Sequence, residues 1–114
     1  MMHYHVTPLE NLAAVLRDGL VPALGPRSLQ MGEPEPAVFL FTSYEAMETA
    51  LSNWLGDEFP EEEALVVLHV DMDALGLPPG RIRQDVSFEI AVLVPVPASV
   101  LVAAEDEGGV VLYR

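Results

Sequence analysis

The sequence predicts an α+β domain whose sheet is mainly antiparallel. Two helical patterns lie in the first half of the chain and most of the strand patterns lie in the second half. That order is typical of α+β proteins rather than of alternating parallel βαβ units. The chain has 114 residues, of which 51% are hydrophobic, so it can enclose one hydrophobic core. We therefore expect a single domain that covers residues 1–114.

The first strand is expected over residues 3–6, and the first helix begins directly after it. Thr7 is a good helix cap, Pro8 suits the first helical position, and Glu10 completes a capping box. Leucine and alanine side chains then recur at helical spacing, which predicts one buried stripe. Gly19 is expected to end this helix in a left-handed conformation.

A segment rich in breaking residues separates the first helix from the next strand. Residues 21–36 contain four prolines and two glycines, which predicts a long loop. The apolar run 37–41 then predicts a buried strand that leads into a second helix with one apolar face. The cap of this helix is either Thr42, which forms a capping box with Glu45, or Ser43.

Strands and turns are expected in the second half of the chain. Residues 64–70 and 86–94 are predicted strands, separated by a turn-rich segment over 71–80. Residues 99–104 and 110–113 are expected to pair as a closing hairpin. The prediction is thus two helices and about six strands.

The chain is strongly acidic. It has 18 aspartates and glutamates against five arginines and no lysine, for a formal net charge of −13. An extended basic surface for a nucleic-acid backbone is therefore excluded. Seven of the acids lie between Glu45 and Glu63, so part of the charge is local. The charge either keeps the protein in solution or forms a surface that docks a basic partner or imitates nucleic acid.

Several other classes of protein lack support in the sequence. No apolar run approaches the roughly 20 residues of a membrane span, and the N-terminus does not have the pattern of a secretion signal, so we expect a cytoplasmic protein. The absence of cysteine excludes disulfides and thiolate metal sites. His69, Asp71 and Asp73 alternate, but the later positions that a calcium loop requires cannot ligate. No metal is therefore expected.

Polar residues in and beside the expected strands are the candidate functional residues. His5 and Thr7 alternate on the first strand and offer hydrogen-bonding groups to a ligand; alternatively, His5 is a buried imidazole bonded to backbone and Thr7 only caps the helix. Glu89 on its strand suits a cationic transition state, or it faces solvent. Tyr44 is either a core aromatic or a stacking platform.

These residues, in this order, resemble the ADP-ribosyltransferase superfamily, in particular its histidine–tyrosine–glutamate branch, which is related to diphtheria toxin and the poly(ADP-ribose) polymerases. The resemblance spans residues 3–97 and is greatest for small bacterial and phage members. Its motifs are His5 with Thr7, Ser43–Tyr44 after a central strand, and Ser87-Phe88-Glu89 on a later strand, together with the opening Tyr4-His5-Val6-Thr7-Pro8-Leu9-Glu10-Asn11-Leu12 and Arg17-Asp18-Gly19-Leu20.

The resemblance implies two small, mainly antiparallel sheets that flank a cleft for NAD, which is the co-substrate. In that cleft His5, helped by Thr7, would hold the adenosine ribose, and Ser43 or Tyr44 would face the nicotinamide and its ribose. Glu89 would hydrogen-bond the nicotinamide ribose and support the developing positive charge. The candidates for pairing with the pyrophosphate are Arg27, Arg81 and Arg83.

The activity that the resemblance implies is NAD-dependent mono-ADP-ribosyl transfer to a protein or nucleic-acid acceptor, as in a toxin or effector, with release of nicotinamide. Ser87 stands where arginine-modifying relatives carry a glutamate, so arginine is a disfavoured acceptor. Two alternatives remain open. The first is NAD hydrolysis, which needs the same residues with water as acceptor. The second is a non-catalytic module of the same fold that binds a basic protein. A membrane partner is not expected.

Overall fold

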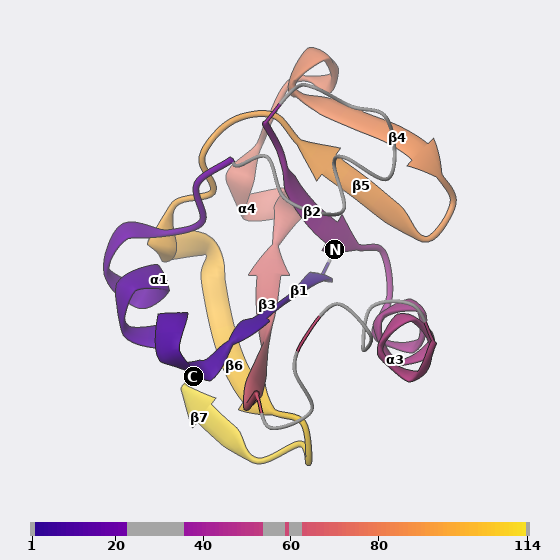
Figure 1. Cartoon of the computed structure of the whole chain (residues 1–114). Helices are drawn as coiled ribbons and strands as arrows, with labels where there is room; N and C mark the ends of the chain where they lie inside the picture. The colour runs from indigo at the N-terminus through magenta and orange to yellow at the C-terminus, as the bar shows by residue number, and fades with distance from the viewer. Residues whose placement is uncertain (1, 23–35, 54–58, 60–62, 114) are drawn as a thin grey trace.

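The computed structural model describes residues 2–22, 36–53, 59 and 63–113. Within these residues the protein is a compact α+β structure with one antiparallel sheet of seven strands and three α-helices (Figure 1). The strands are β1 (Met2–Pro8), β2 (Val38–Phe41), β3 (Leu65–Asp71), β4 (Ile82–Val86), β5 (Glu89–Val92), β6 (Leu101–Asp106) and β7 (Val111–Tyr113). The helices are α1 (Leu12–Asp18), α3 (Tyr44–Ser52) and α4 (Met72–Leu75), with 3-10 turns at Leu9–Asn11, Pro79–Arg81 and Ala98–Val100.

The strands lie in the order β4-β5-β2-β1-β3-β6-β7, and the sheet is narrowest between β2 and β1. Only Tyr4 and Phe41 are paired there, whereas β1 and β3 are paired over all seven residues of each strand. We call this junction the seam; it separates a half made of β4, β5 and β2 from a half made of β1, β3, β6 and β7. The expectation of two sheets is thus corrected to one sheet with a weak junction.

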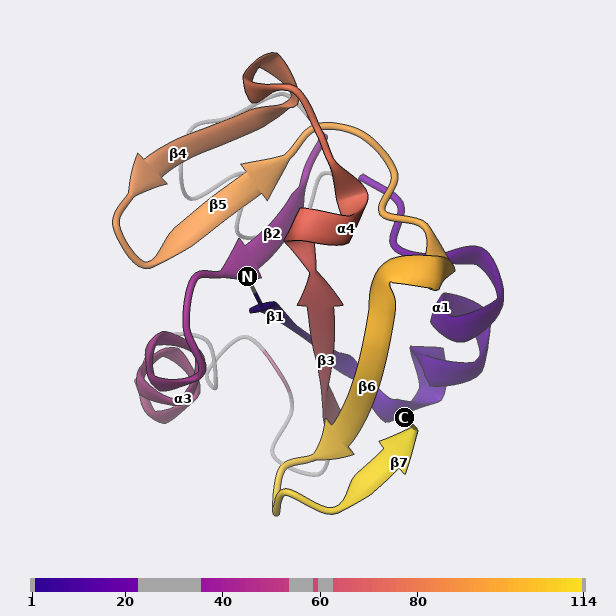
Figure 2. The same cartoon turned by 180° about the vertical axis from the view of Figure 1, so that it is seen from behind.

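Apolar residues cover both faces of the sheet, and a different helix packs on each. On one face Leu40, Leu68 and Ile90 belong to a core cluster that includes Val15 of α1. On the other face Phe41 and Val67 cluster with residues of α3. Figures 1 and 2 show the two helices on opposite sides of β3. Because side chains alternate along a strand, the face of each polar strand residue follows from these clusters.

The start of the first helix differs from the prediction. β1 continues to Pro8, a 3-10 turn follows, and no side-chain cap bond is formed at the start of either helical segment. Thr7 is instead paired with Val66 in the ladder between β1 and β3, and its hydroxyl accepts a hydrogen bond of 3.3 Å from Asn11 Nδ2. Pairing in the sheet therefore overrides the local capping preference, and the predicted capping box was wrong.

Gly19 ends α1 with a positive φ of 81°, as expected, although its ψ of −168° is extended rather than left-handed helical. Its N–H donates to the Val15 carbonyl at 2.7 Å. A Cβ atom at this position would lie 2.2 Å from the Val96 carbonyl oxygen. Glycine is therefore required both by the backbone angle and by the close approach of the segment that pairs with Leu20.

The predicted strand over residues 86–94 is in fact divided. A tight turn at Ser87–Phe88 separates β4 from β5, and the two strands form a hairpin. The polar residues of β4 and the two prolines before it concealed this strand. The one-turn helix α4 lies in the segment that was predicted to be rich in turns. The closing hairpin of β6 and β7 is confirmed; Figure 2 shows β7 at the edge of the sheet. Over the described residues, no helix is both long enough and apolar enough to cross a membrane.

Candidate functional site

The candidate site lies where the end of β2 meets the turn between β4 and β5. The N–H of Thr42 donates to the Phe88 carbonyl at 3.0 Å, and the Thr42 hydroxyl donates to the Ser87 carbonyl at 3.3 Å. Phe41, the residue before Thr42, is paired with Glu89. These bonds fix the beginning of α3 against the beginning of β5.

Ser43 is the cap of α3, which confirms one of the two predicted alternatives. Its Oγ accepts a hydrogen bond of 3.0 Å from the N–H of Ala46. Thr42 does not take this role because its hydroxyl is already engaged with the Ser87 carbonyl. A cap hydroxyl with this bond is held in one orientation, so Ser43 presents a fixed polar atom at the start of the helix.

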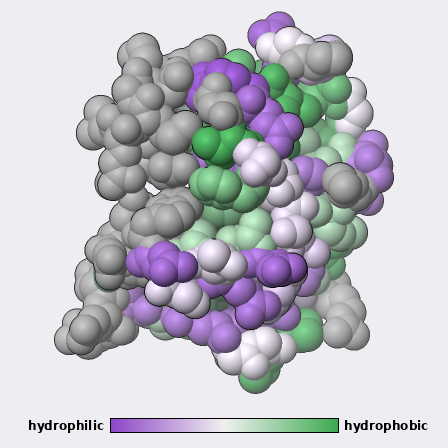
Figure 3. Space-filling view, turned by 90° about the vertical axis from the view of Figure 1, so that its right-hand side faces the viewer, coloured by the Kyte–Doolittle hydropathy of each residue, from purple (hydrophilic) through white to green (hydrophobic). Residues whose placement is uncertain are grey.

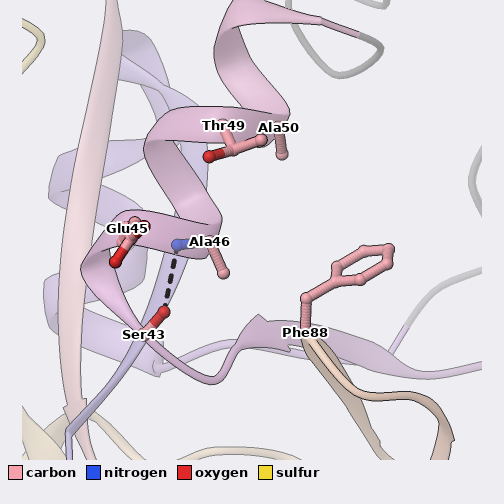
Figure 4. A pocket seen from close by; sticks show the side chains of 6 residues that line it. All are labelled: Ser43, Glu45, Ala46, Thr49, Ala50 and Phe88. Atoms are coloured by element: carbon pink, nitrogen blue, oxygen red, sulfur yellow. Dashed lines mark hydrogen bonds between the residues drawn. The ribbon is translucent and has the colours of Figure 1, made fainter.

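A pocket of about 320 Å³ opens between α3 and the turn that carries Phe88. In Figure 4 the Phe88 ring stands opposite the methyl groups of Ala46 and Ala50, while the Glu45 side chain points away from the hollow. This side of the molecule has apolar surface between more hydrophilic areas (Figure 3). The pocket can therefore accept a flat apolar ring. Its lining residues are Ser43, Glu45, Ala46, Thr49, Ala50 and Phe88.

Glu89 follows Phe88 directly and is buried, with only 4% of its surface exposed. The register aligns Glu89, Phe41 and Tyr4 across three strands, on the face that α3 covers. The alternative of an outward-facing carboxylate is therefore wrong. A buried carboxylate is uncommon unless its surroundings compensate it, which makes Glu89 the most unusual polar residue of the site.

His5 lies at the seam, on the opposite face from Glu89, because it neighbours Tyr4 along β1. Its Nδ1 lies 2.8 Å from the Phe39 carbonyl oxygen. Since a carbonyl can only accept, Nδ1 carries the proton, and in the neutral ring Nε2 is the acceptor. Burial lowers the pKa of His5, and the bond to Phe39 opposes this only in part. The predicted bond to backbone is thus confirmed, although His5 as a whole is half-buried rather than buried.

Tyr44 begins α3 but does not line the pocket. Its ring packs edge-on against Tyr4, with centroids 5.4 Å apart, and lies 6.3 Å from the ring of His69. The nearby carboxylate of Glu105 is the largest of several causes that raise the pKa of Tyr44 to about 12. Of the two residues predicted to face the nicotinamide, the structure puts Ser43 on the pocket side and Tyr44 on the sheet side.

The three candidate arginines differ in their positions. Arg27 lies outside the described residues. Arg81 is exposed at the end of a 3-10 turn, whereas Arg83 is half-buried on β4 and paired with Ala91. Ala91 lies two residues from Glu89 on β5, so Arg83 shares the face of Glu89. Arg83 is therefore better placed than Arg81 with respect to this site.

Four residues of the site or its surroundings were not identified from the sequence as a group: Phe88, Tyr4, His69 and Glu105. Phe88 could have been found, because it lies between two residues of a predicted motif. The others come together only through strand pairing between β1, β3 and β6. Within the described part of the chain, no three histidine, aspartate or glutamate side chains are grouped so as to hold a metal ion.

Comparison of the sequence with protein-family models and with curated protein sequences finds no match.

Proposed function

We propose that this protein is an NAD-dependent mono-ADP-ribosyltransferase with a site at the junction of α3 and β5. The observation that carries the proposal is the buried carboxylate of Glu89, which directly follows Phe88, a residue that lines a pocket suited to a flat ring. The proposal also includes an ADP-ribosyltransferase-like fold, for which the narrow seam between the two halves of the sheet is the structural support.

The chemistry requires one fixed negative charge. The bond between C1′ of the ribose and the nicotinamide nitrogen breaks, and its electron pair stays on nicotinamide, which leaves as a neutral molecule. The ribose then resembles an oxocarbenium cation, which a nearby carboxylate stabilises as in glycosidases. Glu89 would supply this charge from a rigid strand. The acceptor nucleophile bonds to C1′ and loses its proton to solvent.

The pocket supports nicotinamide as the ring that is bound. Phe88 offers an aromatic face, Ala46 and Ala50 offer a flat apolar wall, and Ser43 offers a polar atom. Stacking against aromatic and apolar surfaces orients a planar ring. Orientation is a large part of the catalysis of a transfer reaction, because it removes the entropy cost of bringing the reacting groups together.

The rest of the dinucleotide would extend towards the seam. His5 Nε2 is the acceptor that a ribose hydroxyl needs, since Nδ1 is bonded to Phe39. His5 and Thr7 lie on the face opposite Glu89, so the proposal requires the adenosine to reach the seam rather than to remain in the pocket. Of the two described candidates for the pyrophosphate, Arg83 shares the face of Glu89, but β4 lies on the side of β5 away from the seam, so Arg83 can meet the pyrophosphate only if the dinucleotide bends back towards β4.

The acceptor is expected to be a macromolecule other than an extended nucleic-acid backbone, because the charge of −13 repels phosphates. A basic protein fits this charge best. A cytoplasmic toxin or effector is the setting that we propose for such a reaction. NAD hydrolysis remains the variant of the proposal in which water is the acceptor.

The test is release of nicotinamide from NAD by the purified protein and by the variant Glu89→Gln. The substitution keeps the size of the side chain and removes its charge. We expect turnover to fall by about 100-fold or more, as when one group that stabilises transition-state charge is removed, while NAD binding measured by calorimetry is largely retained.

Glu107→Gln is the matched control, because Glu107 is an exposed acid that bonds to the Leu65 N–H on another part of the sheet. It should turn over NAD at the normal rate. Equal turnover in the Glu89→Gln variant would disprove the role of Glu89. Absence of both NAD binding and turnover in the unmodified protein would favour the non-catalytic module.

A further inference from the structure

A second pocket, of about 180 Å³, lies between α3 and the turn that joins β6 to β7; we call it the turn pocket. It shares no lining residue with the pocket beside Phe88. Residues three and four apart lie on the same side of a helix, and the α3 residues of the two pockets fall on opposite sides. The residues of α3 that line the turn pocket are Tyr44, Met47, Glu48 and Leu51. The helix therefore stands between the two pockets.

The inner surface of the turn pocket is apolar. Met47 and Val67 are buried, with 1% and 2% of their surface exposed, and Leu51 is half-buried against the same core cluster. The volume of the turn pocket is below the roughly 300–1,000 Å³ of pockets that enclose drug-sized ligands. The pocket therefore suits one extended alkyl chain rather than a dinucleotide.

The outer part of the turn pocket attracts a cation. Tyr44 adds an aromatic ring, on which a guanidinium group can stack. Glu48 is an exposed acid one turn further along the same side of α3. The opposite wall adds the acids Asp106 and Glu107, and none of the described residues that line the pocket is basic. A cation that enters is therefore met by negative charge from both walls.

The wall opposite α3 is held in shape by its own acids. Asp106 Oδ1 accepts a hydrogen bond of 2.9 Å from the Gly108 N–H. Glu107 Oε1 accepts one of 3.1 Å from the Leu65 N–H. A wall that is fixed before binding loses little freedom when a ligand enters. We therefore assign the shape of the pocket to the turn and the direct contact with a cation to Glu48.

We propose that the turn pocket binds an arginine side chain of a basic partner protein. The alkyl part of that side chain would pack on Met47 and Leu51, and its guanidinium group would meet Glu48 and the ring of Tyr44. Arginine fits better than lysine, because a planar guanidinium group stacks on aromatic rings and bonds a carboxylate through two donors. The net charge of −13 favours a basic protein over a second copy of this chain, which would be repelled.

The use of the turn pocket to recognise an acceptor rests on the proposed function, whereas the binding of arginine does not. A partner segment that reaches from the turn pocket to the pocket beside Phe88 must cross α3. A helix with its side chains is about 10–12 Å wide, so the crossing needs at least about three or four extended residues. The bound arginine is therefore an anchor, and the residue that is modified lies elsewhere in the same segment.

Nuclear magnetic resonance titration of the isotope-labelled protein tests the binding of arginine. The probe is a capped peptide of glycine and serine with one central arginine, and its control carries citrulline, which has the same shape without the charge. We expect the arginine peptide, at millimolar concentration, to shift the amide signals of α3 and of Gly108 and Gly109, and the citrulline peptide to leave them unchanged. Absence of these shifts, or equal shifts with citrulline, would overturn the proposal.

The charge-reversal variant Glu48→Arg tests the residue assigned to the cation. We expect it to weaken binding of the arginine peptide by about fivefold or more, because an attraction the size of an exposed ion pair is replaced by repulsion. Glu10→Arg is the matched control: Glu10 is also exposed, does not line the turn pocket, and changes the net charge by the same amount. Equal affinity of the two variants for the peptide would refute the role of Glu48.

Spermidine distinguishes a free polyamine from a protein side chain. Weaker binding of spermidine than of the arginine peptide would support the proposal, whereas shifts of the same amides at lower spermidine concentration would show that the pocket is a polyamine site. The titrations contain no NAD, so they decide the binding of arginine whether or not the protein releases nicotinamide. A protein that binds the peptide but releases no nicotinamide would keep this site and lose the proposed function.

Discussion

The imidazole of His5 is held in one tautomer by the Phe39 carbonyl, at the point where β1 and β2 separate. Burial disfavours the charged ring, so its pKa is lowered, and the bond to Phe39 favours Nδ1 as the protonated nitrogen. His5 therefore acts as a neutral group whose hydrogen bond to Phe39 joins β1 to β2 at the seam. Because Nδ1 carries the proton of the neutral ring, Nε2 can accept a hydrogen bond, and it can do so only while the ring is uncharged.

The lowered pKa of His5 makes stability depend on pH. The unfolded chain binds a proton near the usual pKa of about 6.5, and the folded protein binds it only at lower pH, so stability falls as pH decreases below that value. We expect unfolding midpoints in urea to decrease between about pH 7.5 and about pH 5.5. In His5→Asn, whose amide can also donate to Phe39, the decrease should be smaller.

If the urea midpoint falls equally steeply with pH in both proteins, the protonation of His5 is not coupled to unfolding. His3 and His69 are present in both proteins, so their contributions cancel in the comparison.

Single residues were predicted well where local chemistry decides their role. Ser43 was one of two predicted caps. For Glu89 the structure excludes the outward-facing alternative, because the side chain is buried, and its role in the site stays a prediction. Thr7 was misjudged as a cap, since its pairing with Val66 is a contact between distant parts of the chain. For the same reason the sequence did not reveal that the Glu105 carboxylate lies 3.2 Å from His69 Nε2.

At the level of elements, the long apolar strands were predictable and the short polar ones were not. Five of the seven residues of β3 are buried, and its apolar pattern is clear. β4 reads Ile82-Arg83-Gln84-Asp85-Val86, which lacks an apolar run and follows two prolines. β4 is a strand because it pairs with β5, and its own sequence does not predict it. The turn of this hairpin carries Phe88, which lines the pocket.

The glycines that end elements give a test at this scale. Gly19 and Gly76 both have positive φ, at 81° and 61°, but only Gly19 has backbone where a Cβ would lie. We expect Gly76→Ala to cost about 1 kcal/mol, as for an L-residue in a left-handed position. Gly19→Ala should cost more, because the chain paired with Leu20 must also move.

Urea unfolding of the two variants measures the difference in the free energy of unfolding. Equal losses of stability would mean that the contact between Gly19 and the Val96 carbonyl relaxes without cost.

For the whole molecule, composition and order of elements predicted the α+β class and the antiparallel sheet, while the single sheet required the structure. Two sheets were predicted, and a single residue pair at the seam joins the strands into one sheet. No local sequence pattern encodes such a pair. The location of the protein and its single-domain organisation remain predictions.

The net charge of −13 should weaken the folded state at low salt, because like charges repel more strongly in a compact chain. Raising the salt from about 0.01 M to about 0.15 M shortens the screening length from about 30 Å to about 8 Å. We expect the melting temperature to rise over this range. Sucrose at equal osmolality serves as the uncharged control, and a melting temperature that falls with salt would contradict the expectation.

The seam has a consequence for the path of the chain. Although hydrogen bonds barely join the two halves, the backbone passes from one to the other four times, between β1 and β2, β2 and β3, β3 and β4, and β5 and β6. Neither half is a continuous stretch of sequence: β1 and β3 of one half are synthesised before β4 and β5 complete the other, and β6 and β7 follow only after that. Contacts of this kind join residues far apart along the chain, which slows folding. No single cut in the chain yields two fragments that each contain a complete half.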